Sequence, residues 1–207
     1  MDTLARILEQ SNDVIEFSEA YGRYLSGLLS RLDAKAVGRL VEELEQARER
    51  QQTVFFIGNG GSAATASHMA NDLGVGTRAS ETGKPLRALA LTDNVAAMTA
   101  IGNDSGYDNL FLYQLRIHYR PGDKLVAISA SGNSPNLLAA AEWVKQRGGT
   151  VIGLVGFDGG KLKTLCDVVI HVETEKGEYG PVEDIHMIVD HLVYTWLLNK
   201  GLAKAVR

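Results

Sequence analysis

Thr53-Val-Phe-Phe-Ile-Gly-Asn-Gly-Gly-Ser62 runs directly into Ala63-Ala-Thr-Ala-Ser-His-Met-Ala-Asn-Asp72. The first half is a short apolar run rich in aromatic and β-branched residues, which predicts a buried strand ending in a glycine turn. The second half predicts a helix. Glycines allow the backbone to approach a ligand closely, and the free N–H groups at a helix start favour an anion. The sequence therefore predicts a strand, loop and helix unit with a phosphate-sized site at the loop.

This glycine turn differs from the commonest nucleotide-binding loops. No lysine follows its last glycine, and its spacing does not match GxGxxG. Both differences argue against nucleoside triphosphate and nicotinamide chemistry. A glycine-rich turn with no ligand remains an alternative.

Around this unit, apolar runs alternate with longer, mostly helical stretches. Such alternation is typical of an α/β fold in which helices cover both faces of a parallel sheet. The predicted strands cover residues 54–57, 87–91, 124–129, 150–155 and 168–172. Helical periodicity also predicts helices over 3–32 and 35–50, before the first strand, and over 182–199 at the end. We expect a turn, and no ligand, at Phe157-Asp-Gly-Gly160.

Length and composition limit the class of protein. At 207 residues, we expect one domain over 1–207, in which an α/β core over 51–207 follows the leading helices of 1–50. The formal charge is −4 without a Lys/Arg cluster, so nucleic acid is not an expected partner. No signal-like start and no apolar run of about 18 residues is visible, so we expect a cytoplasmic protein that is not bound to a membrane. Cys166 is the single cysteine and is expected to be a small buried residue rather than a nucleophile.

A second loop has similar chemistry. The predicted strand at 124–129 continues into Ala130-Ser-Gly-Asn-Ser-Pro135. Ser134 suits the N-cap and Pro135 the first turn of the helix that follows, so hydroxyls and free N–H groups gather at a helix start. An ordinary serine cap is the alternative. Two such loops at the carboxyl ends of parallel strands favour a ligand, because open α/β sheets bind ligands there.

Histidines and carboxylates form the third pattern. His68 and Asp72 are four residues apart and share one helix face. In the last helix, His186, Asp190 and His191 could be satisfied polar residues on an interface helix.

Together, GNGGS at 58–62, the helical His68 and Asp72, SxSGNS at 129–134, and Glu183 with His191 resemble the sugar isomerase (SIS) domain family, and within it the phosphoheptose isomerases. The resemblance covers nearly the whole chain. It implies a three-layer, flavodoxin-like, five-stranded parallel sheet. It also implies a homotetramer, packed partly through the leading helices, with active sites at subunit interfaces and one zinc ion per subunit.

The resemblance also assigns residues to roles. It implies metal ligation by His68, Asp72, Glu183 and His191. It implies substrate and phosphate contacts from Asn59, Gly60, Gly61, Ser62, Asn103, Asp104, Ser129, Ala130, Ser131, Ser134 and Glu183. Three positions depart from the usual pattern: the family generally has Glu at Asp72, Gln at Glu183 and often Thr at Ala130.

The implied reaction is an aldose–ketose isomerisation of sedoheptulose 7-phosphate to a D-glycero-D-manno-heptose 7-phosphate for surface polysaccharide. It needs a base and an acid/base partner, for which Asp72 and His191 are the candidates. Glu183 and His191 are eight residues apart, about 12 Å along a helix axis, which is too far for one metal. Both can bind it only if the helix begins after Glu183, if the side chains lean together, or if subunits share the site.

Two other functions remain open. A non-catalytic SIS protein that binds a phosphosugar, or associates with DnaA, would need neither Asp72 nor His191. An isomerase of another phosphosugar would keep both residues, and the changes at Asp72 and Glu183 could mark such a subfamily.

Overall fold

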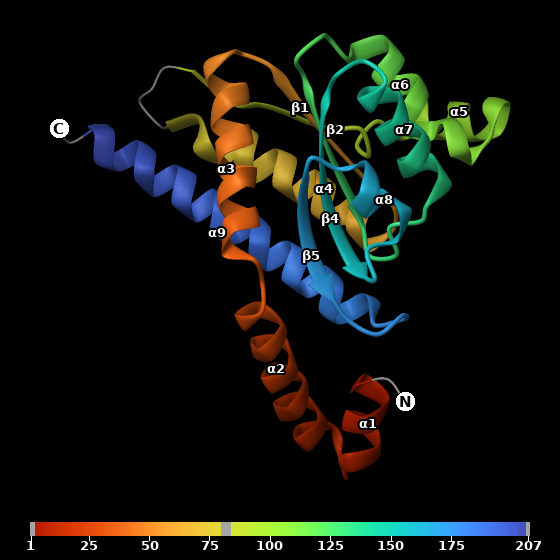
Figure 1. Cartoon of the computed structure of the whole chain (residues 1–207), viewed down its shortest axis with the longest axis vertical. Helices are drawn as coiled ribbons and strands as arrows, with labels where there is room; N and C mark the ends of the chain where they lie inside the picture. Colours follow the sequence, from red (N-terminus) through yellow and green to blue (C-terminus); the bar gives the residue numbers. More distant parts are fainter. Residues whose placement is uncertain (1–2, 80–83, 206–207) are drawn as a thin grey trace.

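Five parallel strands form the centre of the computed structural model, which describes residues 3–79 and 84–205. The strands are β1 (Thr53–Gly58), β2 (Arg87–Ala90), β3 (Lys124–Ser129), β4 (Thr150–Phe157) and β5 (Val168–Glu173), in the order β2-β1-β3-β4-β5 (Figure 1). All five predicted strands are confirmed. This is the flavodoxin-like order, in which β2 is added on one side of β1 and β3, β4 and β5 are added on the other, so the topological switch point lies between β1 and β3. The two predicted ligand loops follow these two neighbouring strands.

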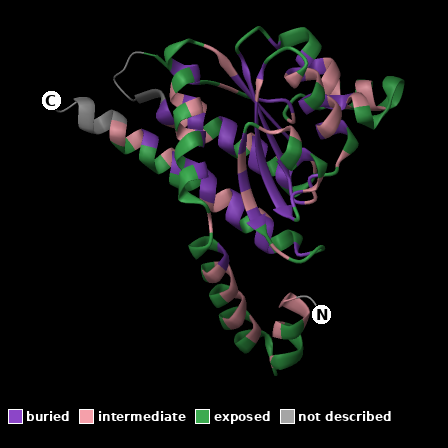
Figure 2. Cartoon of the chain, viewed as in Figure 1, coloured by how far each residue is buried: buried purple, intermediate pink, exposed green. Residues whose placement is uncertain are grey.

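Helices cover both faces of the sheet, so the three-layer prediction is confirmed (Figure 1). Along β1, Val54 and Phe56 enter one buried cluster and Phe55 and Ile57 the other, as the alternation of a strand requires. The first cluster includes residues of α3 (Ala34–Glu49), α4 (Gly61–Ala70) and α9 (Tyr179–Ala205). The second includes residues of α6 (Leu110–His118), α7 (Pro135–Lys145) and α8 (Gly160–Leu165). Figure 2 shows the buried sheet between these layers.

Shorter elements complete the chain. A π-helical turn, η1 (Asn71–Val75), continues α4 and passes into η2 (Gly76–Ala79). The helix α5 (Val95–Ser105) and the 3-10 turn η3 (Tyr107–Asn109) precede α6. In the part of the chain that the structure describes, no helix is both long enough and apolar enough to cross a bilayer.

The prediction of one continuous helix over 3–32 is wrong. The segment forms two helices, α1 (Thr3–Gln10) and α2 (Val14–Ser30), separated at Asp13. The Asp13 side chain accepts hydrogen bonds from the amides of Ile15 and Glu16, both at 2.9 Å, and the Glu16 carboxylate accepts from the Asn12 amide at 2.9 Å. These reciprocal caps start a new helix where apolar periodicity alone continues through the break.

The two leading helices project from the body of the molecule and are attached at the start of α9 (Figure 1). Glu178 is only 1% exposed; its carboxylate accepts from the Leu4 amide at 3.0 Å and from the Tyr24 hydroxyl at 2.5 Å. Tyr21 donates to Asp184 at 2.5 Å. Polar contacts therefore hold α1 and α2 to the same end of α9.

We expect Glu178→Ala to loosen α1 and α2, because it removes two hydrogen bonds whose donors are partly buried, at a cost of about 1 to 3 kcal/mol. Hydrogen exchange of the α1 and α2 amides should become faster while the exchange of the sheet amides stays unchanged. The control is Glu175→Ala, since Glu175 is exposed three residues away. Equal exchange in the Glu178 variant and the wild type would contradict this attachment.

Candidate active site

Close packing requires two glycines of the first loop, Gly58 and Gly61, and backbone conformation requires the third, Gly60. Gly60 has φ 55° and ψ −125°, a backbone conformation that residues with a Cβ rarely adopt. A Cβ on Gly58 would overlap the carbonyl oxygen of Ser62, and a Cβ on Gly61 would overlap the carboxylate of Glu183. The loop therefore brings the start of α4 against α9.

The second loop keeps its hydroxyls close together. Ser129 Oγ accepts from the Gly132 amide at 3.1 Å and lies 3.5 Å from Ser131 Oγ. Ser134 occupies the N-cap position of α7, but its side chain makes no capping hydrogen bond to the described residues. The ordinary serine cap is therefore absent, and this hydroxyl remains available to a ligand.

The predicted turn after β4 supports the serine loop. The Leu162 amide donates to the Gly132 carbonyl at 2.9 Å, and the Lys161 amide donates to Asn133 Oδ1 at 3.1 Å. A Cβ on Gly132 would overlap the carbonyl oxygen of Gly159. Residues 159–162 therefore contact the serine loop and fix its backbone through two hydrogen bonds and close packing.

The two loops enclose one small cavity of about 130 Å³. Its lining contains seven of the residues that the sequence predicts for substrate binding: Asn59, Ser62, Ser129, Ala130, Ser131, Ser134 and Glu183. Ile128 and Tyr179, which were not predicted, complete the lining. Gly60 and Gly61 are not part of this lining; they lie between Asn59 and Ser62 at the start of α4. Asn103 and Asp104 are not brought to this cavity; they lie exposed on α5, where Asn103 donates to Asp104 at 2.7 Å.

An amide pair joins the two loops. Asn59 and Asn136 exchange hydrogen bonds at 2.9 Å in each direction, and the Tyr107 hydroxyl donates to Asn59 Oδ1 at 3.0 Å. Sequence reasoning missed Asn136. Its signal was a polar residue in the first turn of the helix after the serine loop. The pair fixes the distance between the starts of α4 and α7.

The described residues contain a compact group of donors: His68, Asp72, Asp190 and His191. Their ligand atoms all lie within 4.8 Å of one another. His68 Nε2 is 3.2 Å from His191 Nε2, 3.4 Å from Asp72 Oδ2 and 3.9 Å from Asp190 Oδ2. We call these four residues the donor cluster. Two nitrogen and two carboxylate donors form a set that suits zinc.

A change of helix type positions one side of the donor cluster. His68 lies in the last turn of α4, whereas Asp72 lies in the π-helical turn η1. Single π-helical turns occur frequently at functional sites. His68 and Asp72 still meet, so their predicted proximity is confirmed although the helix between them is not regular.

Asp190 is the member that sequence reasoning did not select. Its carboxylate is 0% exposed, and neither oxygen has a hydrogen-bond partner among the described residues. Burial raises the pKa of Asp190 to about 7, and the neighbouring charge of Asp72 adds to this shift. His186 is also fully buried and its Nδ1 has no partner in the described chain. The Nε2 atom of His186 lies 3.4 Å from the Val155 carbonyl oxygen, so His186 has one hydrogen-bond partner, as a satisfied polar residue would. For Asp190 the view as a satisfied polar group is wrong. The available signal was a carboxylate inside an apolar stripe of α9.

Glu183 lies apart from the donor cluster. The Glu183 carboxylate lies beside Gly61 at the start of α4, and His191, eight residues later on α9, lies beside His68 near the end of α4. The helices α4 and α9 therefore run side by side in the same direction. Burial raises the pKa of Glu183, and the charge of Asp184 adds to the effect. The structure thus places Glu183 in the small cavity and places Asp190 with the predicted ligands His68, Asp72 and His191.

Cys166 lies in neither place. It is partly buried at the C-terminal end of α8 and packs against the buried cluster that includes residues of α6, α7 and α8. Burial raises the pKa of its thiol to about 12, so the group stays protonated at neutral pH. It behaves as the small packing residue that the sequence predicts.

Comparisons with known proteins give one consistent set of relatives. The SIS domain family pattern matches residues 16–156. A phosphoheptose isomerase of Rhodospirillum rubrum is 45% identical over 68% of this chain and 72% of its own, and one of Maridesulfovibrio salexigens is 32% identical over 98% and 93%. The solved phosphoheptose isomerase GmhA of Neisseria gonorrhoeae superimposes with a TM-score of 0.78 at 30% identity, covering 88% of this chain and 96% of that one.

Burial lowers the pKa of His186 to about 4, which predicts a pH-dependent stability. Because the folded state disfavours the imidazolium, the stabilisation is complete above pH 6.5 and is lost as the pH falls toward 4, by about 3 kcal/mol. We expect the wild type to lose that amount of unfolding free energy, relative to His186→Leu, between pH 7 and pH 4, because leucine does not titrate. Urea unfolding at fixed protein concentration measures it. A difference that is constant with pH would contradict the assignment.

Proposed function

Because this chain belongs to the SIS domain family, and within it to the phosphoheptose isomerases, we propose that it interconverts sedoheptulose 7-phosphate and D-glycero-D-manno-heptose 7-phosphate. The reaction is an aldose–ketose isomerisation that supplies heptose for surface polysaccharide, such as lipopolysaccharide or capsule. It moves one proton between adjacent carbons through an enediol.

The observation that carries this proposal is the placement of two different sites on the same two helices. The small cavity lies at the start of α4, where serine hydroxyls and the positive helix end suit a phosphate. The donor cluster begins at His68, seven residues after Gly61, which is about 10 Å along the helix axis. Six carbon–carbon bonds in an extended chain span roughly 8 Å, from bond lengths of about 1.5 Å. A seven-carbon sugar phosphate therefore fits with its phosphate in the cavity and its carbonyl end at the donor cluster.

Asp72 and His191 carry the proton transfers in this proposal. Asp72 Oδ2 lies on the side of His68, while Asp72 Oδ1 accepts a hydrogen bond from the side-chain Nδ2 of Asn71 at 3.1 Å. Oδ1 is the atom that we assign to take the carbon-bound proton. His191 is partly open to solvent beside His68, where it can give a proton to and take one from the sugar oxygens.

Zinc is the metal that this donor set fits. The chemistry of two imidazoles with carboxylates supports it, as does a buried carboxylate without a hydrogen-bond partner in the described chain. His68, Asp72 and His191 would hold the ion. When bound, it would polarise the carbonyl oxygen and stabilise negative charge there. Asp72 and His191 would still move the protons.

Two alternatives are less well supported. A phosphosugar-binding regulator, such as a DnaA-associating relative, needs the cavity but has no use for Asp72 and His191 side by side with His68. An isomerase of a shorter phosphosugar would place the carbonyl carbon one or two carbons short of the donor cluster. The spacing along α4 favours seven carbons.

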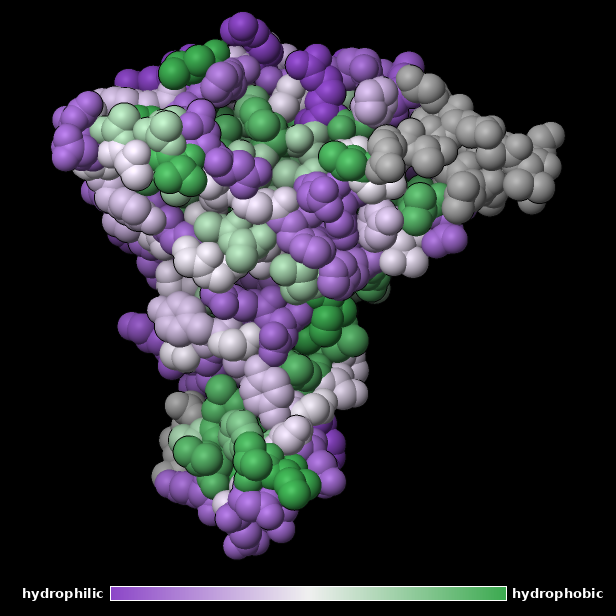
Figure 3. All heavy atoms as spheres, turned by 180° about the vertical axis from the view of Figure 1, so that it is seen from behind, coloured by the Kyte–Doolittle hydropathy of each residue, from purple (hydrophilic) through white to green (hydrophobic). Residues whose placement is uncertain are grey.

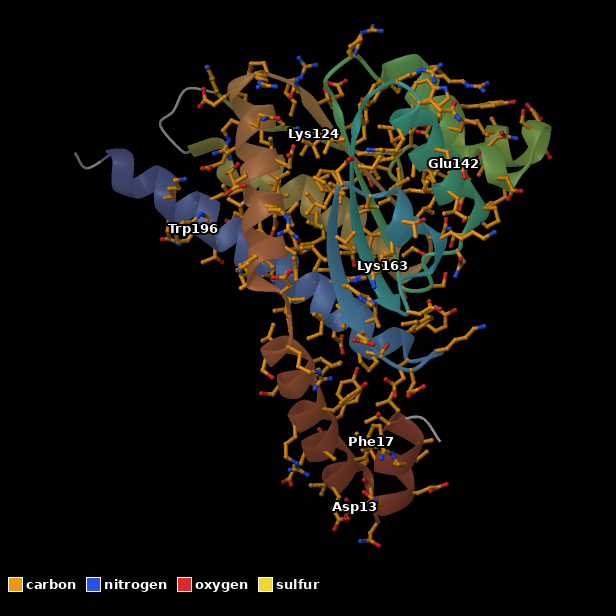
Figure 4. All side chains as sticks on the ribbon, in the orientation of Figure 1. Asp13, Phe17, Lys124, Glu142, Lys163 and Trp196 are labelled. Carbon is orange, nitrogen blue, oxygen red and sulfur yellow. The ribbon has the colours of Figure 1, made fainter. Side chains whose placement is uncertain are left out.

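We also propose that the protein is a cytoplasmic homotetramer that packs through its leading helices and through α9. Val14 and Ile15 on α2 are 77% and 67% exposed, and Trp196 on α9 is 56% exposed. Figure 3 shows apolar side chains gathered at the end of the molecule formed by the leading helices, and Figure 4 shows Trp196 on α9, at a distance from Phe17 on α2. Apolar surface on separate elements suits more than one kind of contact between copies.

We expect the purified protein to convert sedoheptulose 7-phosphate to the aldose, with kcat/KM at least tenfold above that for fructose 6-phosphate or ribulose 5-phosphate. Asp72→Asn should lower kcat by about 10² to 10⁴, because it removes a base while keeping the shape of the side chain. Aldose formation is followed by a coupled kinase assay, with and without chelator.

The matched control is Glu142→Gln, an exposed carboxylate on α7 on the far side of the sheet from α9 (Figure 4). It should retain wild-type activity. Absence of turnover with all three ketose phosphates, at full zinc occupancy, would reject the proposal that this protein is a ketose phosphate isomerase. Full activity of Asp72→Asn would reject only the assignment of the base.

Light scattering should give the mass of four chains for the wild type. Ile15→Glu and Trp196→Glu should each shift the protein to smaller species, since a charge cannot be buried cheaply in an apolar interface. Glu142→Lys should leave the mass unchanged. A monomeric wild type would contradict the tetramer.

A further inference from the structure

A second cavity, of about 630 Å³, lies at the opposite end of the sheet from the small cavity. It is lined by Arg116, Tyr119, Pro121, Trp143 and Arg147, and we call it the arginine pocket. Tyr119 and Pro121 precede β3, and Arg147 precedes β4, so the pocket lies at the amino ends of these strands. The serine loop follows the carboxyl end of β3, and the six residues of that strand span about 20 Å. The arginine pocket is therefore separate from the candidate active site.

The lining of the arginine pocket is cationic. It contains two arginines and no carboxylate, in a chain whose formal charge is −4. Asp123, in the link before β3, is 4% exposed, and its two oxygens accept from the backbone amides of Thr53 at 2.7 Å and Arg120 at 2.8 Å. Glu142 precedes Trp143 on α7 but does not line the pocket. The lining therefore offers its positive charge to an anion.

Arg147 is held against one wall of the arginine pocket. Its guanidinium carbon lies 3.8 Å from the centroid of the Trp143 ring, and its Nη1 donates to the Trp143 carbonyl at 3.2 Å. Tyr119 packs edge to face on Trp143, with ring centroids 5.6 Å apart and an angle of 82° between the rings. The Tyr119 hydroxyl donates to the Asp123 carbonyl at 2.8 Å. These contacts order the guanidinium before any ligand binds, which lowers the entropy cost of binding.

Arg116 supplies the second charge, from α6, which packs against α7 (Figure 1). Its guanidinium carbon lies 5.4 Å from the ring centroid of Tyr113, one turn earlier on the same helix. Within residues 3–79 and 84–205, Arg116 has no hydrogen bond and no ion pair. All five of its N–H donors therefore remain for a ligand. A guanidinium fork matches two oxygens of one phosphate group.

Aromatic rings and arginines together favour one class of ligand. A nucleobase stacks on an aromatic ring or on the plane of a guanidinium, and its phosphates pair with guanidinium N–H groups. A sugar phosphate would leave the aromatic wall without a stacking partner, and an apolar ligand would cover two charges without pairing them. The volume also lies within the range of small-molecule sites, about 300 to 1,000 Å³.

We propose that the arginine pocket is a binding site for a nucleoside diphosphate. The base stacks on the Arg147 guanidinium over Trp143, and the phosphate groups accept hydrogen bonds from Arg116. The inference does not rest on the proposed isomerisation or on zinc, because the arginine pocket shares no residue with the small cavity or with the donor cluster.

The test measures binding to the full chain by isothermal titration calorimetry, with ADP, UDP, adenosine and pyrophosphate as probes. We expect ADP or UDP to bind about tenfold or more tightly than adenosine or pyrophosphate, because each fragment engages only half of the lining. Arg116→Ala should weaken nucleotide binding by about 10- to 100-fold, the scale of hydrogen bonds to charged groups. Trp143→Leu should weaken it by about tenfold, since it removes the support of the stacked base.

Arg120→Ala is the matched control. Arg120 is exposed, lies between Tyr119 and Pro121, and is not part of the lining. Its variant should bind nucleotide within about twofold of the wild type, because solvent screens an exposed charge outside the pocket. Arg116 is exposed as well, so Arg116→Ala should keep the wild-type melting temperature and decides the result even if Trp143→Leu is less stable.

Absence of binding of both ADP and UDP to the wild type at about 1 mM would overturn the inference. Equal nucleotide affinity in the wild type and Arg116→Ala would also overturn it. Displacement of bound nucleotide by sedoheptulose 7-phosphate would place the nucleotide in the small cavity, with the same consequence. Nucleotide binding that depends on Arg116, in a protein without turnover of any ketose phosphate, would reject the proposed isomerisation and keep the inference.

Discussion

The structure depends on the side-by-side packing of α4 and α9 on one face of the sheet. Met69 of α4 and Val189 of α9 are both fully buried in the same apolar cluster, which fixes the register between the helices. With this register, Gly61 meets Glu183 and, two turns later, His68 meets His191. Closely packed interiors do not slide continuously. A shift of one helix along the other would therefore disturb the anion cavity and the donor cluster together.

Local patterns in the sequence were sufficient for the sheet and both loops. A strand such as Thr53–Gly58 is buried on both faces, so it appears as a continuous apolar run, and the glycines after it can serve only a turn or a close approach. The helix break at Asp13 was missed for an equally local reason. A capping side chain competes with helix continuation, while apolar periodicity records only which face is buried.

The donor cluster could be predicted only in part, because its composition is a property of tertiary packing. His68 and Asp72 are four residues apart and could be paired from spacing. Asp190 had one signal, a carboxylate inside an apolar stripe of the last helix, but the sequence does not state which other helix that carboxylate is buried beside. Glu183 shows a related limit: resemblance assigns a position in an alignment, whereas the rise of α9 separates Glu183 from His191 by about 12 Å along the axis of one chain.

The position of Glu183 creates an electrostatic conflict that the fold itself reduces. The phosphate proposed to bind in the cavity and the Glu183 carboxylate both favour the positive end of α4, and two anions in so small a space repel each other. Burial raises the pKa of Glu183, and an approaching phosphate acts in the same direction. A protonated Glu183 can donate a hydrogen bond to a phosphate oxygen, which an ionised carboxylate cannot do.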